Sequence, residues 1–403
     1  MKRGDCERSQ CPFNSFHEGD AAVNGKAYRV LLLAAILCAA GGIFLKKNYV
    51  PDDDLAGVVS ENVESPETAQ TSEDLQEGEN TETQQESQTE MQEKSQEKSQ
   101  EKIQAEKDYI HWVDFQVSYE ALCEAYEADQ ILHEKNVSAD WINLLAVTAA
   151  ESGGTFGKKE VNRIRELAAS LSDGSTTLEK ESLNLKYYDY YKEAYGAVLS
   201  QYVGDYVFLE TDDAGNTTET EGYGLKAFSP IAKGFPYSDY DDFGASRSYG
   251  YNRPHLGHDM MGQTGTPIIA VESGLVECLG WNQYGGWRIG IRSFDKKRYY
   301  YYAHLRQNYP YAEGLQEGDT VAAGQVIGYM GHTGYSSQEN VNNIDETHLH
   351  FGIQLIFDES QKEGNNEIWI DCYALVRFLY RNQTPVVKVG ETREWISHKT
   401  LKQ

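Results

Sequence analysis

The longest apolar stretch lies near the start of the chain, where residues 30–45 read VLLLAAILCAAGGIFL without a charge. As a helix this run spans about 24 Å, somewhat less than a hydrocarbon core of about 30 Å. Adjacent residues extend it, and Lys46 and Lys47 can extend to the lipid headgroups. We therefore predict a single-pass transmembrane signal anchor at 28–47, preceded by a cytoplasmic segment at 1–27.

Other interpretations of this apolar run are weaker. A cleaved signal peptide needs a cut near the small residues 39–42, but Ile43, Phe44 and Leu45 continue the apolar run past them. Ala-Ile-Leu before Cys38 lacks the small residue that a lipoprotein signal needs there. A buried core helix needs a neighbouring core, and the polar segment that follows offers none. Basic residues flank both ends, so we place the large domains outside because of their size.

Residues 48–107 consist mainly of Glu, Gln, Ser and Thr and include the tandem QEKSQEKSQEK. Such a repeat is compatible with a fluctuating helix or coiled coil, but it has no apolar stripe with which to pack. Residues 51–106 carry 17 acidic residues and three lysines, which is about half of the formal net charge of −27. We predict a disordered acidic linker that holds the folded part away from the membrane.

From 108 to 207 the apolar positions recur every three or four residues. In SADWINLLAVTAAESGG, Trp141, Leu144 and Leu145 share a helical face, with Ser138 as the cap and two glycines as the stop. The stretch YYDYYKEAYGAVLSQYV has a tyrosine stripe at the same spacing. These patterns predict a small α-helical domain at 108–207.

The stretch AAESGGTF within this helical part has a second interpretation. A Glu-Ser pair after an apolar helix resembles the catalytic start of lytic transglycosylases, in which Glu151 would be the general acid. The Gly-Leu-Met-Gln element that follows in those enzymes is absent from this sequence. We therefore favour the simple end of a helix.

From 208 to 383 the pattern changes to short alternating runs, such as TPIIAVESGLVECLG and RIGIRSF, separated by glycine-rich turns. A helical stretch, CYALVRFLYRN, closes this part, and 384–403 follow as a C-terminal tail. With 403 residues, the chain is long enough for two or more folded units. We predict an α+β multidomain protein with a mainly antiparallel β domain after the helical one.

Charge and cysteine content exclude two classes of function. The net charge of −27 argues against nucleic acid, because phosphate backbones are bound by clustered Lys and Arg. The six cysteines form no CxxC-like cluster, so a thiolate zinc site is not indicated. Cys278 and Cys372 can form a disulfide only if they are close in space, and their scattered spacing favours buried free thiols.

Histidines occur in three pieces of the β-rich part: HLGHD, YYYYAHL and THLHFGIQL. Alternate residues of a strand share a face, so His348 and His350 point together while the apolar residues beside them point the other way. Tyr302 and His304 also share a parity, which lets His304 point where the other two point. Zinc prefers such nitrogen and oxygen ligands on rigid elements, so the three pieces favour a metal site.

Parity also separates the candidates in RPHLGHDMMG. His255 and Asp259 are four residues apart and lie on the same side of an extended chain, whereas His258 points the other way. Gly257 between them can distort this arrangement. We therefore expect His258 to lie outside any metal site.

The stretches FGASRSYGYNRPHLGHDMMGQTGTPIIAVESGLV, YYYYAHL, VAAGQVIGYMGHTG and THLHFGIQL together resemble the lysostaphin-type zinc metallopeptidases, which cleave peptidoglycan peptides. The resemblance covers 240–356 and includes neither the helical part nor the linker. It implies a compact, barrel-like antiparallel β fold with the metal at the floor of a groove.

This resemblance also implies the roles of five residues. His255, Asp259 and His350 would hold one Zn²⁺, with a water as the fourth ligand. His304 and His348 would be the catalytic pair, one as general base and the other stabilising the oxyanion. The sequence does not decide which histidine has which role.

The sequence departs from the family pattern at three places. The segment YSSQENVNNIDE is longer than the usual turn, so we expect a remodelled groove wall. Gly352 stands where many relatives have Glu, and we expect little effect because this position is not a ligand. For His332, in the glycine-rich turn, we expect a solvated turn residue rather than a substrate contact.

These observations together predict a membrane-anchored zinc-dependent peptidoglycan endopeptidase at the bacterial cell membrane, with its catalytic domain on the extracytoplasmic side. Its expected partners are peptidoglycan peptides, the membrane through one helix, and envelope proteins through the helical domain. The alternative is a non-catalytic scaffold or binding protein of the envelope, for example in a sporulation assembly. The five intact polar residues favour an enzyme, and an enzyme held latent by its helical domain is a third possibility.

Overall fold

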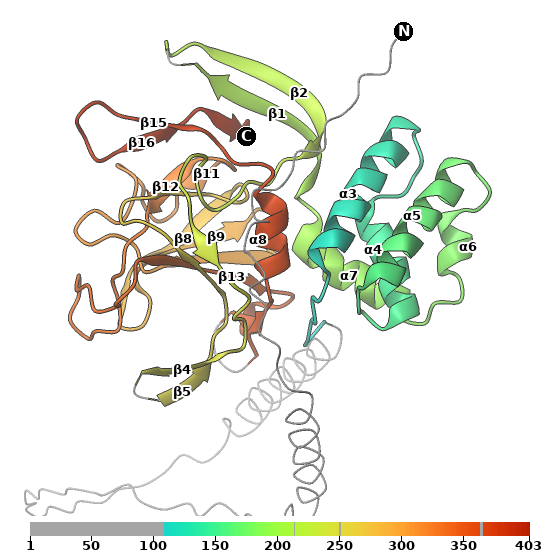
Figure 1. The fold of residues 1–403 in the computed structure, drawn as a ribbon, viewed down its shortest axis with the longest axis horizontal. Coiled ribbons are helices and arrows are strands. Elements are labelled where there is room, and N and C mark those ends of the chain that lie inside the picture. The colour runs from blue at the N-terminus through green and yellow to red at the C-terminus, as the bar shows by residue number, and fades with distance from the viewer. Residues whose placement is uncertain (1–108, 213, 250, 363–365) are drawn as a thin grey trace, which may run out of the picture. The chain divides into compact units, whose positions relative to one another are not determined.

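The computed structural model describes residues 109–403, except 213, 250 and 363–365 (Figure 1). The predicted cytoplasmic segment, signal anchor and linker lie outside the described residues. Within the described part, no helix combines the length and apolar character needed to cross a membrane.

Five helices form the first described part of the chain. They are α3 (Tyr119–Glu134), α4 (Trp141–Ser152), α5 (Lys158–Ser172), α6 (Leu178–Ser182) and α7 (Tyr188–Leu199). Helix α4 begins slightly later than predicted, because Asp140 and not Ser138 is its cap: the Asp140 carboxylate accepts from the Asn143 N–H, and the Asn143 side chain accepts from the Asp140 N–H. Gly153, with φ of 74°, ends it as predicted.

The predicted apolar stripes form the interior of this helical part. Trp141, Leu144 and Leu145 of α4 are buried, as is Tyr195 of α7, and the two helices contact each other. The helical domain predicted from the 3.6-residue period is therefore present as a packed structure.

The remainder of the chain is mainly antiparallel β structure, as predicted. Its strands are β1 (Val203–Thr211), β2 (Thr217–Leu225), β3 (Ser238–Asp239), β4 (Ser246–Tyr249), β5 (Tyr251–Pro254), β6 (His258–Met261), β7 (Pro267–Ile269), β8 (Gly274–Asn282), β9 (Gly286–Ser293), β10 (Arg298–Ala303), β11 (Thr320–Val321), β12 (Val326–Tyr329), β13 (His348–Leu355), β14 (Ile368–Trp369), β15 (Val386–Lys388), β16 (Trp395–Ser397) and β17 (Lys399–Leu401). A 3₁₀ turn (Glu359–Gln361) and α8 (Tyr373–Leu379) interrupt them. The main sheet has the order β11-β8-β9-β10-β13-β6-β3, with β14 on β13.

Residues 384–403, predicted as a tail, are part of the fold. They form β15, β16 and β17, and β17 pairs with β1 so that Phe208 faces Leu401. A three-stranded sheet, β17-β1-β2, results beside the main sheet (Figure 1). Strands β15, β16 and β17 have three residues each, which is too short to show an alternation of polar and apolar residues. The sequence therefore indicated only a tail.

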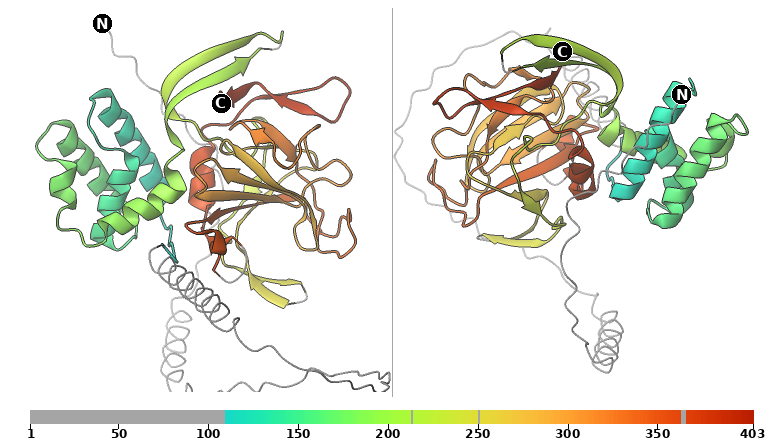
Figure 2. Two further views of the ribbon diagram at one scale, coloured as in Figure 1. Left: turned by 180° about the vertical axis from the view of Figure 1, so that it is seen from behind. Right: turned by 45° about the horizontal axis from the view of Figure 1, so that its top comes forward.

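Helix α8 joins the helical part to the sheet (Figure 2). Its Phe378 packs against Trp141 of α4 and Tyr126 of α3, with ring centroids 5.7 and 5.6 Å apart. The apolar core is continuous from the helices through α8 to the sheet. The two parts predicted as separate domains therefore share one interior.

A buried polar network also crosses this junction. Arg298 of β10 is fully buried and donates to both carboxylate oxygens of Glu272, to Asp295 and to the backbone carbonyl of Ala197 in α7. Its positive charge is thus fully surrounded by acceptors, as a buried guanidinium requires.

The cysteines of the described part are free thiols. Cys278 and Cys372 therefore form no disulfide, and Cys372 is fully buried beside the Phe351 carbonyl. This agrees with the preferred interpretation of their scattered spacing.

Candidate metal centre

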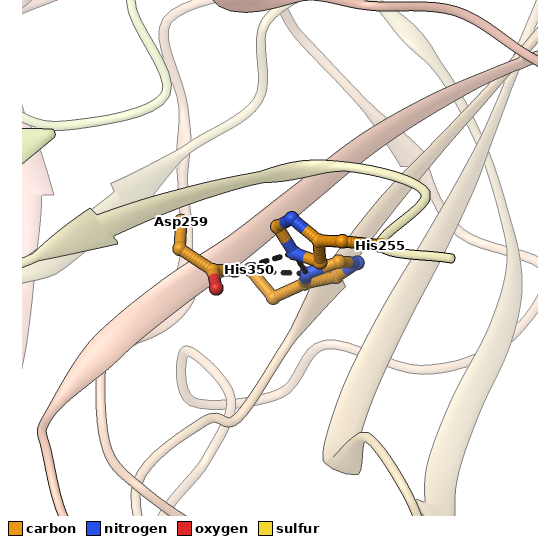
Figure 3. A group of neighbouring side chains, drawn as sticks. All are labelled: His255, Asp259 and His350. Atoms are coloured by element: carbon orange, nitrogen blue, oxygen red, sulfur yellow. Dashed lines mark hydrogen bonds and ion pairs between the residues drawn. The ribbon is translucent and has the colours of Figure 1, made fainter. Parts of the chain in front are cut away.

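Strand pairing brings two of the predicted ligands together. In the antiparallel pair β6–β13, His350 faces Asp259, while Leu349 faces Met260 on the buried side. His255 lies just before β6, and its Nε2 is 3.0 Å from Asp259 Oδ1 and 2.9 Å from His350 Nδ1 (Figure 3). His350 Nδ1 is 3.0 Å from the same carboxylate oxygen. The three candidate ligand atoms thus form a compact triangle.

Gly257 explains how the chain makes this approach. A Cβ at this position would lie 2.6 Å from His350 Cε1 and 2.8 Å from the Phe351 carbonyl oxygen. The backbone between His255 and Asp259 therefore passes directly over the His350 ring, and only glycine leaves room for it. The glycine of the HxGxD pattern has a steric reason in this structure.

Hydrogen-bond partners assign the proton of His255. Its Nδ1 lies 3.2 Å from both the carbonyl and a carboxylate oxygen of Asp242, two acceptors that call for an N–H. In the neutral ring Nε2 then carries the lone pair, which faces Asp259 and His350. In this tautomer His255 Nε2 meets Asp259 and His350 with a lone pair and not with an N–H.

The surroundings of Asp259 and His350 determine their charge states. Burial alone would raise the pKa of Asp259, but the ring nitrogens of His255 and His350 hold it well below its usual value. Burial lowers the pKa of His350 despite the adjacent carboxylate, which favours the neutral ring. With His255 Nε2 and His350 Nδ1 both unprotonated, two imidazole lone pairs would face the Asp259 carboxylate at about 3 Å, an arrangement that a bound cation stabilises. This donor set fits Zn²⁺.

The predicted catalytic histidines lie beside this triangle. The His304 and His348 ring centroids are 4.7 Å apart, and His348 Nε2 is 3.8 Å from Asp259 Oδ1. His304 Nδ1 lies 3.0 Å from the Thr333 carbonyl and His348 Nδ1 lies 2.8 Å from the Glu346 carbonyl. Each Nδ1 is therefore the donor, and each Nε2 is left with its lone pair. Burial lowers the pKa of His304 well below its usual value, and the neighbouring His348 adds to this effect.

The parity argument for His304 is wrong, although His304 does lie beside the ligand triangle. Tyr302 does not face the site: it pairs with Phe351 and is fully buried in the core. In a regular strand His304 would follow Tyr302 into the core. Its φ of 61° turns it toward His348 instead. Alternation alone could not have predicted this turn.

His258 lies on the opposite side of β6 from Asp259, as parity predicts. It is buried and its Nε2 is 2.8 Å from Asp239 Oδ2, while its ring packs against Tyr373. It is not one of the three residues that form the triangle.

Two residues that support the triangle were missed by the sequence analysis. Asp242 contacts His255 as described, and Arg247 contacts both Asp242 and Asp259, the latter at 3.3 Å. Outer contacts of this kind fix the orientation and tautomer of a ligand histidine. Both precede the HxGxD pattern in loop and hairpin positions, where no periodicity marks them.

The long insertion forms part of the cavity wall. Tyr335 lines a cavity of about 780 Å³ that also contains His255, Asp259, His304, His348 and His350. His332, predicted to be a solvated turn residue, is half-buried, and its Nδ1 is 2.8 Å from the Ile344 carbonyl. His332 is therefore less solvated than expected, because it fastens the insertion to the turn; it is not among the residues that line the cavity, in keeping with the expectation that it is no substrate contact.

Gly352, two residues after the ligand His350 on β13, has a steric reason for being glycine. A Cβ there would lie 2.7 Å from the Trp369 ring. Trp369 therefore occupies the space above this position, and a larger side chain such as Glu would require it to move.

Glu151 takes no part in this site. Its two carboxylate oxygens accept from Arg163, whose Nη2 also lies 2.7 Å from Glu181. The residue is the second to last of α4 and lies two positions before the left-handed Gly153, which agrees with the interpretation as a helix end.

The comparisons with known proteins identify the β-rich part. Residues 253–365 match the model of Peptidase family M23, and the chain therefore carries a peptidase family M23 domain. It is 36% identical over 141 residues to the L-Ala--D-Glu endopeptidase of Bacillus subtilis (strain 168), covering 35% of this chain and 40% of that protein. It is 38% identical over 98 residues to lysostaphin of Staphylococcus staphylolyticus, covering 24% of this chain and 18% of that protein.

A crystal structure of a lytM protein from Ruminococcus gnavus ATCC 29149 is similar at 25% identity. The match covers 68% of this chain and 92% of that one, with a TM-score of 0.41. The chain spans less than half the length of the Bacillus subtilis endopeptidase and of lysostaphin. The family resemblance rests on the M23 domain.

Proposed function

We propose that this protein is a zinc-dependent endopeptidase that hydrolyses peptide bonds of peptidoglycan. One observation carries the proposal: the three-residue ligand triangle lies in the cavity together with two further histidines whose Nδ1 atoms contact backbone carbonyls and whose Nε2 atoms have no hydrogen bond to a described residue. The homology of the M23 domain to peptidoglycan endopeptidases supports the substrate class.

In this proposal His255, Asp259 and His350 hold one Zn²⁺. The ion, when bound, lowers the pKa of a water and polarises the scissile carbonyl. The single carboxylate leaves the site with net positive charge, and Asp242 and Arg247 keep the ligand side chains in place.

The remaining chemistry belongs to His304 and His348. Their Nδ1–H groups donate to backbone carbonyls, so each Nε2 can accept a proton from the attacking water. The histidine that does not act as base can donate to the oxyanion once it is protonated. We assign the two roles to the pair, because their Nδ1 contacts are equivalent.

Membrane attachment is a separate part of the proposal, because it rests on the apolar run and the linker alone. We propose that 28–47 anchor the protein and that the acidic linker lets the M23 domain reach the wall from the outer side. Extraction of cell membranes with alkaline carbonate would leave an anchored chain in the pellet, whereas release into the supernatant would contradict the anchor.

The enzymatic proposal is tested with the full chain purified in detergent. We expect one equivalent of zinc and the release of new amino termini from purified peptidoglycan, abolished by a chelator and restored by zinc. If the chain binds one zinc but releases no amino termini from walls of several peptide chemistries, it is a scaffold or binding protein instead. Mass analysis of the products would identify the bond that is cut.

A further inference from the structure

The cavity around the metal centre is lined by four basic side chains, in a chain with a net charge of −27. Two of them are neutralised by acidic neighbours: Arg247 contacts Asp259 and a second aspartate, and Lys362 lies 2.8 Å from Glu277. The other two, Arg253 and Arg288, have no acidic partner among the described residues.

The lining also holds two acidic groups. Asp259 belongs to the ligand triangle, whereas Glu367 accepts a hydrogen bond from the neutral Trp369 Nε1 at 2.7 Å and keeps its negative charge. Among the described residues the cavity therefore presents two guanidinium groups without an acidic partner against this one carboxylate.

Arg288 lies on the cavity side of β9. The residue after it, Ile289, pairs with Tyr302 on the core side, so alternation directs Arg288 to the side of Tyr301. Its Nε is buried and has no hydrogen-bond partner, and its guanidinium donates no hydrogen bond to any described residue. A buried donor without an acceptor is energetically unfavourable. An anion bound beside Arg288 would supply the missing acceptor.

Arg253 comes from the other wall, two residues before the ligand His255. Its guanidinium lies 5.0 Å from the Tyr284 ring centroid and 5.7 Å from that of Tyr335, and Nη2 donates to the Tyr335 hydroxyl at 3.3 Å. The aromatic rings fix its position, while its Nε is buried and has no partner. The charge is therefore preorganised and not neutralised.

Both arginines line the same cavity as Tyr301 and the ligand His350. The Tyr301 ring centroid is 5.9 Å from that of His350. Burial raises the pKa of the Tyr301 hydroxyl, and the positive charges of Arg288 and Arg253 oppose this rise, which agrees with their place in the same lining. The two guanidinium groups therefore belong to the cavity that contains the metal centre.

We propose that Arg253 and Arg288 bind a free carboxylate of the substrate, so that this site selects acidic stem peptides over neutral glycine bridges. A glutamate in a peptide chain keeps one free carboxylate whichever of its carboxyl groups forms the peptide bond, and a glycine bridge has none. Guanidinium groups bind carboxylates with charge-assisted hydrogen bonds, which supply the missing acceptors. This inference rests on the proposed endopeptidase function and adds the substrate class to it.

The test compares substrates that differ in one functional group. The zinc-loaded full chain is assayed with cross-linked stem-peptide dimers whose glutamates carry either free carboxylates or carboxamides, and with pentaglycine. We expect kcat/KM to be about ten- to a hundred-fold higher for the carboxylate dimer than for the carboxamide dimer. In Arg288→Gln and Arg253→Gln this ratio falls toward one while the zinc content stays at one equivalent.

A matched control removes an equal charge elsewhere. Arg165→Gln, at an exposed arginine that pairs with Glu124 in the helical part, should keep the full ratio. Equal rates for the two dimers in the unaltered chain, or a preference for pentaglycine, would overturn the inference while the endopeptidase function stands. If no peptide and no wall preparation is cleaved, the proposed function itself fails.

A binding measurement tests the inference without any variant or turnover. Calorimetry with the zinc-free full chain should give at least about a tenfold lower Kd for the carboxylate dimer than for the carboxamide dimer. Equal dissociation constants would contradict carboxylate recognition, even if the arginine variants failed to fold.

Discussion

The helical part and the β-rich part use polar residues in opposite ways. In the helical part the interior is mainly aliphatic and aromatic, its few buried polar side chains such as Asp129 and Asn143 are hydrogen-bonded within the fold, and other charges form ion pairs at the surface, as between Arg163 and Glu151. In the β-rich part His255, Asp259, His304 and His348 are each less than 9% exposed. Burial of polar side chains is costly, so its concentration in one part of the molecule indicates where the chemistry takes place.

The two parts also differ in how far apart in sequence their contacts are. The helical interior depends on spacings of three or four residues, which act locally. The metal centre depends on the β6–β13 pairing, which joins Asp259 to His350 across most of the domain. Changes at the metal centre should therefore affect chemistry, and changes in the helical part should affect stability alone.

The largest effect is expected from His350→Ala. Because this change removes one of three ligand atoms, we expect zinc binding to fall and the release of amino termini from peptidoglycan to drop by on the order of 10³-fold or more. Metal analysis and the amino-terminus assay measure the two quantities.

The control for this prediction is His258→Ala, at a histidine of β6, the strand that pairs with the His350 strand β13. His258 is bonded to Asp239 and faces away from the ligands, so the variant should keep its zinc although it loses stability. Loss of zinc in His258→Ala would show that the assignment of the ligands is wrong.

The next effect concerns the junction between the two parts. Arg298→Met leaves the Glu272 carboxylate buried without its cation, so we expect the free energy of unfolding to fall by about 3–5 kcal/mol. Denaturant unfolding measures this loss. Adding Glu272→Leu should recover part of it, because the uncompensated charge is then removed; a single-variant loss below about 1 kcal/mol would contradict the structural role of this network.

Substituting one glycine in the β-rich part and one in the helical part compares the two parts directly. Gly257→Ala places a Cβ against the His350 ring, so we expect zinc affinity to fall about 10- to 100-fold. Gly153→Ala, at the end of α4, meets no atom within 4 Å and only strains a left-handed residue. It should cost about 1 kcal/mol of stability and leave zinc affinity unchanged. Equal zinc affinities of the two variants in titrations would refute the steric role of Gly257.

The smallest effect is expected from Glu151→Gln. It breaks an exposed ion pair with Arg163, which contributes at most about 1 kcal/mol. Peptidoglycan release should be unchanged. A strong loss of wall hydrolysis in this variant would revive the transglycosylase interpretation and place chemistry in the helical part.

Local patterns were sufficient for the helices and for one strand of the site, but not for the short strands of 384–403. The heptad-like spacing around Trp141 gave the helix, and the alternation in THLHF gave the common direction of His348 and His350. In both cases the cause lies within a few residues, so a single sequence contains it.

The remaining features depend on contacts between distant segments. The turn of His304 toward the site requires its φ of 61°, which no residue pattern near it encodes. Asp242 supports His255 from a loop, and Arg253 lies between two tyrosines from other loops. Such contacts arise only when the segments meet, so the sequence alone could not predict them.

The pairing of β17 with β1 has a consequence for synthesis of the protein. Because Phe208 faces Leu401, the three-stranded sheet cannot form until residues 399–401 have left the ribosome. The contacts among α3–α7 join residues close in sequence and can form earlier, although Trp141 and Tyr126 meet Phe378 only after α8 has been made. During translation β1 therefore waits with one edge unpaired, and a partner that covers this edge would protect the nascent chain from aggregation.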